Sequence, residues 1–360
     1  MRASIVEALR QGISEAMEKD PRVFCIGEDV DIPGGFGGAF TVTLGLAARF
    51  PGRMVNTPIS EAAIFGMACG AAAMGMRPIA DVQYGDFLMN AGSQVVNQIA
   101  KLRYMSGGNL KLPLVMRAPV GVTGRGAQHS QNLESFFLSC PGIKIVAPST
   151  AYDALGLLRT ATKEDDPVLI FEHKLLYGSK GPRSESGTVD ASSDIPDAEY
   201  TVPIGKGIVR REGTDVTVVA THLMMHRSLE AASALAAEGI SVEVIDPRSL
   251  VPFDWELLKA SVAKTNRLVV VEESPKRGGL GAEIAATFAE EMIDSLAAPI
   301  VRVAAPNTPA PFSPPMERFY VPQVCRIAEG IRGLMAMSDP ALDGAVATGK
   351  LREIRDVPDS

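Results

Sequence analysis

The chain has 360 residues, of which 46% are hydrophobic and 21% are charged, a composition typical of a globular protein with two domains of ordinary size. Its 42 acidic and 35 basic residues give a net charge of −7 without any basic run, so we expect no nucleic-acid partner. No apolar run approaches the length of a membrane span, so we expect no membrane association.

The first half of the chain alternates helices with short apolar strands. An opening amphipathic helix leads to a strand at Val23–Gly27 and then to a glycine-rich loop at Gly34–Gly38, whose role the sequence does not indicate. Further strands are expected within residues 77–84, 113–119, 143–149 and 167–173, and helices from residue 60, over 87–104 and over 151–162. Largely apolar strands separated by helices predict a parallel sheet that is covered on both faces.

The second half repeats this pattern after an interruption. Strands are expected within residues 215–221, 241–247, 267–273 and 299–305, with helices over 227–238, 255–264 and 278–296. We therefore predict a two-domain α/β protein with mostly parallel sheets covered by helices. The domains are expected at residues 1–177 and 201–336, joined by a Gly-, Pro- and Ser-rich linker at 178–200 and followed by a disordered tail at 337–360.

The cysteines and the N-terminal residues indicate the cellular compartment of the protein. Cys25, Cys69, Cys140 and Cys325 are widely spaced and form no metal-binding pattern, which favours free thiols in a reducing compartment. The first twenty residues form the pattern of an amphipathic helix and not of a signal peptide. We therefore expect a cytoplasmic protein.

The helix after residue 60 is the most unusual element of the chain. Ser60 is placed as its N-cap and Glu61 as an acid in its first turn, followed by a run of small residues that includes Gly66 and Gly70. Each glycine costs about 1 kcal/mol of helix stability, and helices that tolerate this are often pressed against another backbone, so the helix suits a subunit or domain contact. Glu61 either complements the helix dipole or is a desolvated acid that exchanges protons.

His129 is the most suggestive of the four histidines. It lies in a glycine-containing loop after an expected strand, either as a solvated loop residue or as a catalytic one. No phosphate-binding glycine loop, nucleophile elbow or zinc motif occurs in the sequence. The Gly278–Gly281 segment lies between a strand and a helix, where it forms either a tight turn or an anion site.

Eight segments, in this order across residues 1–335, resemble the β subunit of a thiamine-diphosphate-dependent 2-oxoacid dehydrogenase, the decarboxylating first component, in the transketolase-like superfamily. The segments are Gly27–Val30, Thr57–Glu61, Gly85–Phe87, Leu102–Gly108, Gly126–Gln131, Cys140–Ser149, Glu243–Asp254 and Gly278–Ala286. The resemblance implies a pyrimidine-binding domain followed by a transketolase-type C-terminal domain.

The resemblance also implies roles for individual residues. Glu61 matches the glutamate that hydrogen-bonds the aminopyrimidine ring of the cofactor and promotes its imino form, from which the reactive carbanion arises. Phe87 matches an aromatic that packs on the pyrimidine, although a core role is open for it as well. His129 matches a histidine near the substrate and the acyl-transfer step, and Glu28 resembles a second acid linked to the first through water.

Partners and ions follow from the same resemblance. These enzymes hold the diphosphate and Mg²⁺ on an α subunit through a motif that this chain lacks, so it is expected to complete its site in an α₂β₂ heterotetramer that docks a dihydrolipoyl acyltransferase core. The family also places K⁺ on backbone carbonyls that correspond to Leu114, Ala161, Thr162, Glu164 and Asp166. Pyruvate, a branched-chain 2-oxoacid and acetoin are all open as substrates. The alternatives are an acetoin dehydrogenase β subunit and a non-catalytic scaffold of the same fold.

Overall fold

A computed structural model describes residues 1–32, 37–178 and 189–337. Residues 34–36 of the glycine-rich loop, most of the first half of the expected linker and the tail after residue 337 lie outside the described residues. The chain divides into two compact units. The first comprises residues 1–123, 128–206 and 248–252, and the second comprises residues 124–127, 207–247 and those from 253 onward.

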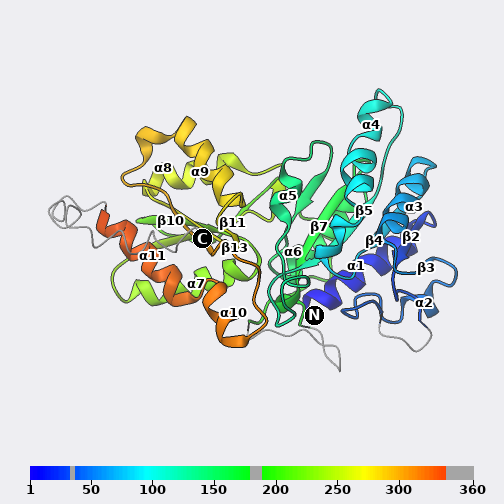
Figure 1. Cartoon of the computed structure of the whole chain (residues 1–360), viewed down its shortest axis with the longest axis horizontal. Coiled ribbons are helices and arrows are strands. Elements are labelled where there is room, and N and C mark those ends of the chain that lie inside the picture. Colours follow the sequence, from blue (N-terminus) through cyan, green and yellow to red (C-terminus); the bar gives the residue numbers. More distant parts are fainter. Residues whose placement is uncertain (33–36, 179–188, 338–360) are drawn as a thin grey trace. The chain divides into compact units, whose positions relative to one another are not determined.

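The first unit is built on a seven-stranded sheet with the order β12-β6-β7-β5-β4-β2-β3 (Figure 1). Its neighbouring strands are parallel except for β12, which pairs antiparallel with β6. The expected parallel sheet is thus confirmed. The strands are β2 (Val23–Gly27), β3 (Met54–Asn56), β4 (Arg77–Asp81), β5 (Val115–Val120), β6 (Lys144–Val146), β7 (Val168–His173) and β12 (Ser249–Val251), and a separate ribbon joins β1 (Arg2–Ala3) to β8 (Ser193–Asp194).

Helices cover this sheet. Ser4 caps α1 in a reciprocal capping box with Glu7, and α1 packs against α6, where Gly12 leaves room for Leu155 and Leu158. Helix α3 packs on β2 and β4. The helices of this unit are α1 (Ile5–Lys19), α2 (Leu46–Arg49), α3 (Glu61–Ala73), α4 (Leu102–Met105), α5 (Glu134–Leu138), α6 (Ala151–Ala161) and the short helix η3 (Lys174–Leu176).

The single long helix expected over residues 87–104 is wrong. The segment is divided into a 3₁₀ helix, η1 (Gly85–Met89), a π helix, η2 (Gln94–Ile99), and the short α4. Residues 90 and 91 form a turn between η1 and the helical residues that begin at 92, and asparagine at position 90 is a poor helix former, which accounts for the end of η1. The break leaves Phe87 in a short element of its own directly after β4.

The second unit has a five-stranded sheet with the order β14-β13-β10-β11-β9, parallel except for β9. Its strands are β9 (Ile208–Arg211), β10 (Val216–Ala220), β11 (Val242–Asp246), β13 (Leu268–Pro275) and β14 (Val301–Ala305). Its helices are α7 (His222–Ala236), α8 (Trp255–Thr265), α9 (Leu280–Glu291), η4 (Ile293–Ser295), α10 (Pro314–Tyr320) and α11 (Val324–Met337).

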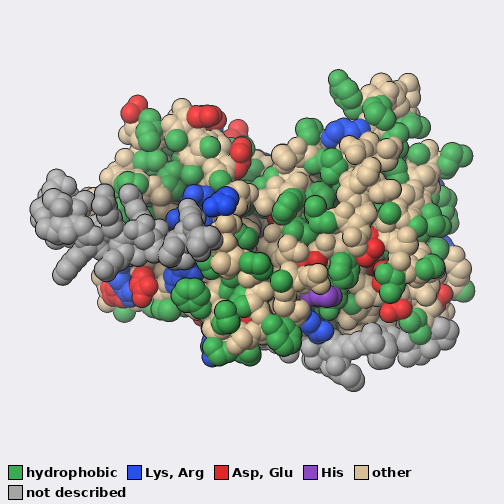
Figure 2. Space-filling view, viewed as in Figure 1, with side chains coloured by type: hydrophobic (Ala, Val, Ile, Leu, Met, Phe, Trp, Pro, Cys, Tyr) green, Lys and Arg blue, Asp and Glu red, His purple; other side chains and the backbone are tan. Residues whose placement is uncertain are grey.

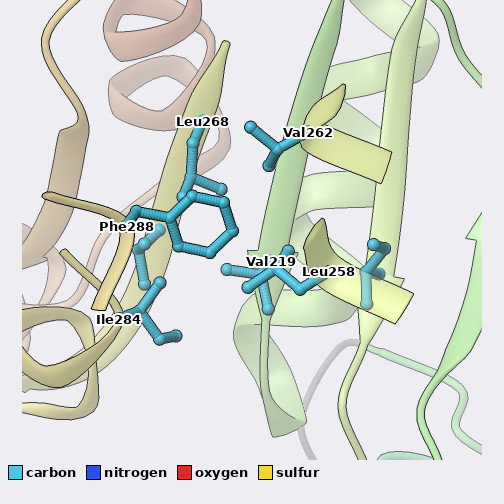
Figure 3. Packing of buried hydrophobic residues seen from close by; sticks show 8 residues of the cluster. Val219, Leu258, Val262, Leu268, Ile284 and Phe288 are labelled. Atoms are coloured by element: carbon cyan, nitrogen blue, oxygen red, sulfur yellow. The ribbon is translucent and has the colours of Figure 1, made fainter. Parts of the chain in front are cut away.

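The core of the second unit lies between its sheet and helices α8 and α9. Figure 3 shows Phe288 and Ile284 of α9 beside Val219 of β10, with Leu258 of α8 close by. These side chains are at most 1% exposed. Burying each of these four side chains stabilises the fold by roughly 1.5–3 kcal/mol.

Two further findings concern the helices and the cysteines. No helix among residues 1–32, 37–178 and 189–337 is long and apolar enough to span a membrane. All four cysteines are free thiols, of which Cys25, Cys69 and Cys140 are buried and Cys325 is exposed.

Candidate functional site

Four of the predicted site residues follow the carboxyl ends of four adjacent parallel strands of the first unit. Glu28 comes directly after β2, Glu61 a short turn after β3, Phe87 after β4 and His129 after β5. These strands lie side by side in the order β5-β4-β2-β3. Since the carboxyl ends of parallel strands share one edge of the sheet, the topology brings the four residues to that edge, where α/β proteins bind their ligands.

Glu61 is the first residue of α3 and is buried, with 7% of its surface exposed. Ser60 holds the N-cap position as expected, but its side chain makes no capping hydrogen bond. Within the described parts of the chain, Glu61 makes no hydrogen bond and no ion pair. Its carboxylate oxygens are not among the fully buried atoms without a partner in that part of the chain, so they are open to a ligand that brings an N–H or O–H group to them.

Glu28 lies close enough to Glu61 to be affected by its charge. Burial raises the pKa of the Glu28 carboxyl, and the negative charges of Glu61, Asp29 and Asp81 raise it further. The Glu28 carboxyl therefore holds its proton more readily than an isolated one. A water-mediated link between Glu28 and Glu61 stays a prediction.

Phe87 and His129 are brought together by a small aromatic cluster. The ring centroids of Phe87 and His129 lie 5.3 Å apart, edge to face, and the centroids of Tyr84 and His129 lie 4.7 Å apart in the same arrangement. Tyr84 in turn contacts Phe40 at 5.3 Å. Both Phe87 and His129 are half-buried, so Phe87 is not a core residue, and each keeps part of its ring open to a ligand.

Two buried charged residues hold the loop that carries His129. The ammonium of Lys174 donates to the backbone oxygen of His129 at 2.9 Å and lies 5.3 Å from the centroid of the Tyr84 ring. Asp86 Oδ1 accepts from the backbone N–H of Gln131 at 3.1 Å and from its side-chain amide at 2.9 Å. Lys174 and Asp86 are 0% and 7% exposed. Our sequence reasoning missed both, although a lysine directly after an apolar strand is a signal for Lys174.

Unsatisfied polar atoms adjoin these contacts. Asp86 Oδ2 and the hydroxyl of Ser130 are buried, and neither has a hydrogen-bond partner within residues 1–32, 37–178 and 189–337. Ser130 directly follows His129, so both orphan atoms belong to the segments that the aromatic cluster connects. Buried polar groups without a partner are rare, and at a candidate site they are compatible with a bound ligand or water.

A buried ion-pair network crosses the middle of the same sheet. Arg117 of β5 binds Glu172 of β7 with two hydrogen bonds of 2.8 and 2.7 Å, and it also pairs with Asp81 of β4. The hydroxyl of Tyr177 donates to Glu172 at 2.6 Å. Burial raises the pKa of Asp81 to about 6, although Arg117 opposes that shift. Charged residues within otherwise apolar strands could have indicated a buried ion pair from the sequence, but the sequence analysis did not predict one.

Of the residues expected to bind K⁺, Leu114 directly precedes β5, and the others lie between the end of α6 and the start of β7, at the opposite end of these strands. The backbone oxygens of Thr162 and Glu164 both accept from the guanidinium of Arg77, at 3.0 and 2.5 Å. The carbonyl oxygens of Leu114 and Ala161 accept backbone hydrogen bonds, from Val168 N–H and Glu164 N–H respectively. The carbonyl oxygens of Thr162 and Glu164 therefore already contact a positively charged side chain of the protein, Arg77.

The Gly278–Gly281 segment of the second unit forms a tight turn around an internal carboxylate. Glu272 is 4% exposed and accepts from the Ser274 hydroxyl at 2.8 Å and from Gly281 N–H at 3.2 Å. A Cβ atom at Gly279 would lie 2.3 Å from Glu272 Oε2, so the carboxylate fills the space under the turn. Burial raises the pKa of Glu272 to about 7. The acceptor at this helix end is therefore a side chain of the protein.

Groups of three or more His, Cys, Asp or Glu side chains that could hold a metal ion do not occur in the part of the chain that the structure describes. The site at the sheet edge consists instead of two carboxyls, an aromatic cluster and a histidine. Such a set can bind an aromatic heterocycle, hold a proton on a buried acid and place a histidine beside a reacting group.

Family models match both units. The transketolase pyrimidine-binding domain matches residues 2–180, and the transketolase C-terminal domain matches residues 205–327. The chain is also similar to a solved structure described as a split-gene transketolase, an inactive β4 tetramer. The TM-score is 0.75 at 26% identity, and the match covers 93% of this chain and 99% of that one.

Three curated relatives illustrate the sequence similarity. The β subunit of acetoin:2,6-dichlorophenolindophenol oxidoreductase from Cupriavidus necator is 43% identical, over 92% of this chain and 97% of the relative. The 2-oxoisovalerate dehydrogenase β subunit of Bacillus subtilis is 42% identical, over 92% and 98%. The mitochondrial pyruvate dehydrogenase E1 component subunit beta-2 of Oryza sativa is 42% identical, over 89% and 83%.

Proposed function

The chain belongs to the family of transketolase-like β subunits of thiamine-diphosphate-dependent 2-oxoacid dehydrogenases, and from this premise we propose that it contributes the pyrimidine-binding half of the cofactor site. The observation that carries the proposal is Glu61, a buried carboxylate without a protein partner in the described chain, at the ligand-binding edge of the sheet. An aminopyrimidine ring would supply the donor that this carboxylate lacks.

Thiamine diphosphate, when bound, supplies the carbon nucleophile and the electron sink for decarboxylation of a 2-oxoacid. Glu61 would bind the aminopyrimidine and hold the proton that it exchanges with the ring. Glu28, whose pKa is raised by burial and by the charge of Glu61, would pass a proton to or from it. Phe87 would pack against the pyrimidine. His129 would act beside the substrate and at the transfer of the acyl group to a lipoyl group.

We also propose that the site is completed by an α subunit in an α₂β₂ heterotetramer, with Mg²⁺ and the diphosphate on the α chain and an acyltransferase core as the further partner. Figure 2 shows hydrophobic side chains at the surface over helices α3 and α4. Met67, Met74 and Tyr104 are 55%, 85% and 87% exposed. An added Cβ at Gly70 of α3 meets no atom within 4 Å in the described chain, so this position is open to close packing by another subunit.

The substrate is an open choice among three. Relatives named for acetoin, 2-oxoisovalerate and pyruvate are all 42–43% identical to this chain, so identity does not separate these activities. Oxidative decarboxylation of a 2-oxoacid is the proposed reaction, and acetoin cleavage is the alternative. We further propose a cytoplasmic location, which the four free thiols support.

Potassium binding at Leu114, Ala161, Thr162, Glu164 and Asp166 is likewise a proposal. A carbonyl oxygen has two lone pairs, so Thr162 and Glu164 can accept from Arg77 and still face an ion. We expect KCl to raise the thermal midpoint of the protein relative to choline chloride at equal ionic strength. Equal midpoints in the two salts would argue that the guanidinium of Arg77 is the only cation there.

The decisive experiment is turnover of the chain alone and co-produced with its candidate α chain, with pyruvate, 2-oxoisovalerate and acetoin as donors. We expect activity only in the pair. The Glu61→Gln variant should assemble with the α chain and lose turnover. Glu283→Gln is the matched control, because Glu283 also lies in the first turn of a helix but is exposed. Normal turnover of Glu61→Gln would refute the proposal, and an inactive but assembled wild-type pair would favour a non-catalytic scaffold.

A further inference from the structure

The loop that carries His129 is held on both sides of the histidine by buried charged residues. This loop contains no helix or strand between β5 and α5, so its conformation depends on the groups that contact it. Lys174 donates to the backbone oxygen of His129, and Asp86 accepts two hydrogen bonds from Gln131, two residues further along. The two contacts therefore fix the main chain on either side of Ser130.

Lys174 is completely buried and donates a hydrogen bond to the backbone of His129. It lies in η3, directly after β7, and is 0% exposed. Its ammonium reaches the His129 carbonyl at 2.9 Å and also lies over the face of Tyr84. Hydrogen bonds from an ionised donor are roughly twice as strong as neutral ones, and a cation over an aromatic face is attracted by the ring. The same ring packs edge to face on His129, so Lys174 restrains both the backbone and the ring environment of the histidine.

Asp86 connects the loop to the element that carries Phe87. It precedes Phe87 in η1, and its Oδ1 binds both the main-chain and the side-chain N–H of Gln131. Because η1 and the loop are tied together in this way, these hydrogen bonds support the 5.3 Å contact between Phe87 and His129. A preset arrangement of this kind avoids ordering the loop during the reaction.

We propose that Lys174 and Asp86 are positioning residues, which hold His129 for the acyl-transfer step of the reaction. This inference rests on the proposed function, because it gives His129 its role there. Neither residue needs to touch the substrate. Their effect is to fix the backbone from which the imidazole extends, so that the histidine is already placed when the lipoyl group arrives.

The test compares two half-reactions of the assembled α₂β₂ enzyme. Reduction of 2,6-dichlorophenolindophenol by the 2-oxoacid reports the cofactor chemistry, and acylation of a lipoyl domain reports the transfer step. We expect Lys174→Met to slow acyl transfer by about 10- to 100-fold, as a displaced catalytic group does, and to change dye reduction much less. His129→Ala is the reference, with an expected loss of about 100-fold or more in acyl transfer.

A double-mutant cycle separates positioning from general stability. In the His129→Ala background, Lys174→Met should cause no further loss of acyl transfer, since the group that it positions is absent. Asp86→Asn keeps the shape of the acceptor and serves if Lys174→Met does not fold. Asp86→Asn should also slow acyl transfer when His129 is present, by a smaller factor, and cause no further loss in the His129→Ala background.

Each outcome is informative. Equal losses from Lys174→Met in the presence and absence of His129 would refute positioning, as would unchanged acyl transfer in a folded single variant. If His129→Ala itself transfers acyl groups normally, the proposed role of His129 fails, and the positioning role fails with it. If His129→Ala is defective while Lys174→Met and Asp86→Asn are normal, only the positioning role is overturned.

Discussion

Replacing Glu272 by Gln should change how the stability of the second unit depends on pH. Glu272 is buried beneath the turn at Gly278–Gly281, and burial raises its pKa from 4.5 to about 7 in the folded protein. A carboxyl with a raised folded pKa stabilises the fold while it is protonated in both states, at pH below 4.5. That contribution is lost as the pH rises through about 7, because the unfolded chain then releases the proton more readily.

The size of the effect follows from the shift. Each pKa unit corresponds to about 1.36 kcal/mol, so a shift of roughly 2.5 units corresponds to about 3 kcal/mol. Wild type should therefore lose about 3 kcal/mol relative to Glu272→Gln between pH 4.5 and pH 8. The glutamine retains an oxygen that can accept from Gly281 N–H, so the turn itself keeps its contact.

Urea unfolding at half-unit intervals from pH 4.5 to 8, followed by far-ultraviolet circular dichroism, measures this difference. The Glu283→Gln variant controls for loss of a negative charge near the start of α9, since Glu283 is exposed. Its curve should run parallel to that of wild type. If the free energy of unfolding of wild type and of Glu272→Gln changed in parallel with pH, the reasoning would be refuted. Glu272 would then have the same pKa in the folded and the unfolded chain.

Further predictions concern the first unit and the thiols. Gly142→Ala should destabilise the protein by several kcal/mol in thermal unfolding, because φ is +105° and the new Cβ would lie 1.9 Å from a backbone oxygen. Gly75→Ala is the control: φ is +93°, but the new Cβ meets no atom within 4 Å, so this variant should cost about 1–2 kcal/mol. Arg117→Met should cost about 3–5 kcal/mol in urea unfolding, since it leaves Glu172 buried without its cation, and an unchanged midpoint would contradict this. In native protein treated with a disulfide reagent, Cys325 should react quickly and the other cysteines only on unfolding; rapid reaction of more than one thiol would contradict the burial.

Most strands of the parallel sheets were predictable because they lie within apolar runs bounded by turn residues. The three-residue strands β3 and β12 were not predicted, because they are too short to form a pattern. Glu61 at the start of a helix was predictable from local residues, since Ser60 is a favoured N-cap residue and an acid is common in the first turn. The division of residues 85–105 into a 3₁₀, a π and an α helix was not predicted, because π helices are rare and 3₁₀ helices are short, so one α helix was expected. The domain boundaries proposed from composition stay predictions.

The site was predictable only in part. Phe87, His129 and Glu61 could be named from a family resemblance, and the structure places them at one edge of one sheet. Lys174 and Asp86 were missed because a buried charge is identified by what it contacts, and these contacts are with residues 45 positions away along the chain. Local patterns contain no information about contacts at that separation.

The edge strand β12 has a consequence for how this chain is made. Residues 249–251 complete the first unit's sheet by pairing with β6, yet they leave the ribosome after β9, β10, α7 and β11 of the second unit. Until then β6 exposes a free edge, with backbone groups that can pair with a neighbouring nascent chain. The first unit therefore cannot finish folding before much of the second has been synthesised. A gene truncated after residue 206 would encode a sheet that lacks its last strand, and that product should depend on chaperones and tend to aggregate.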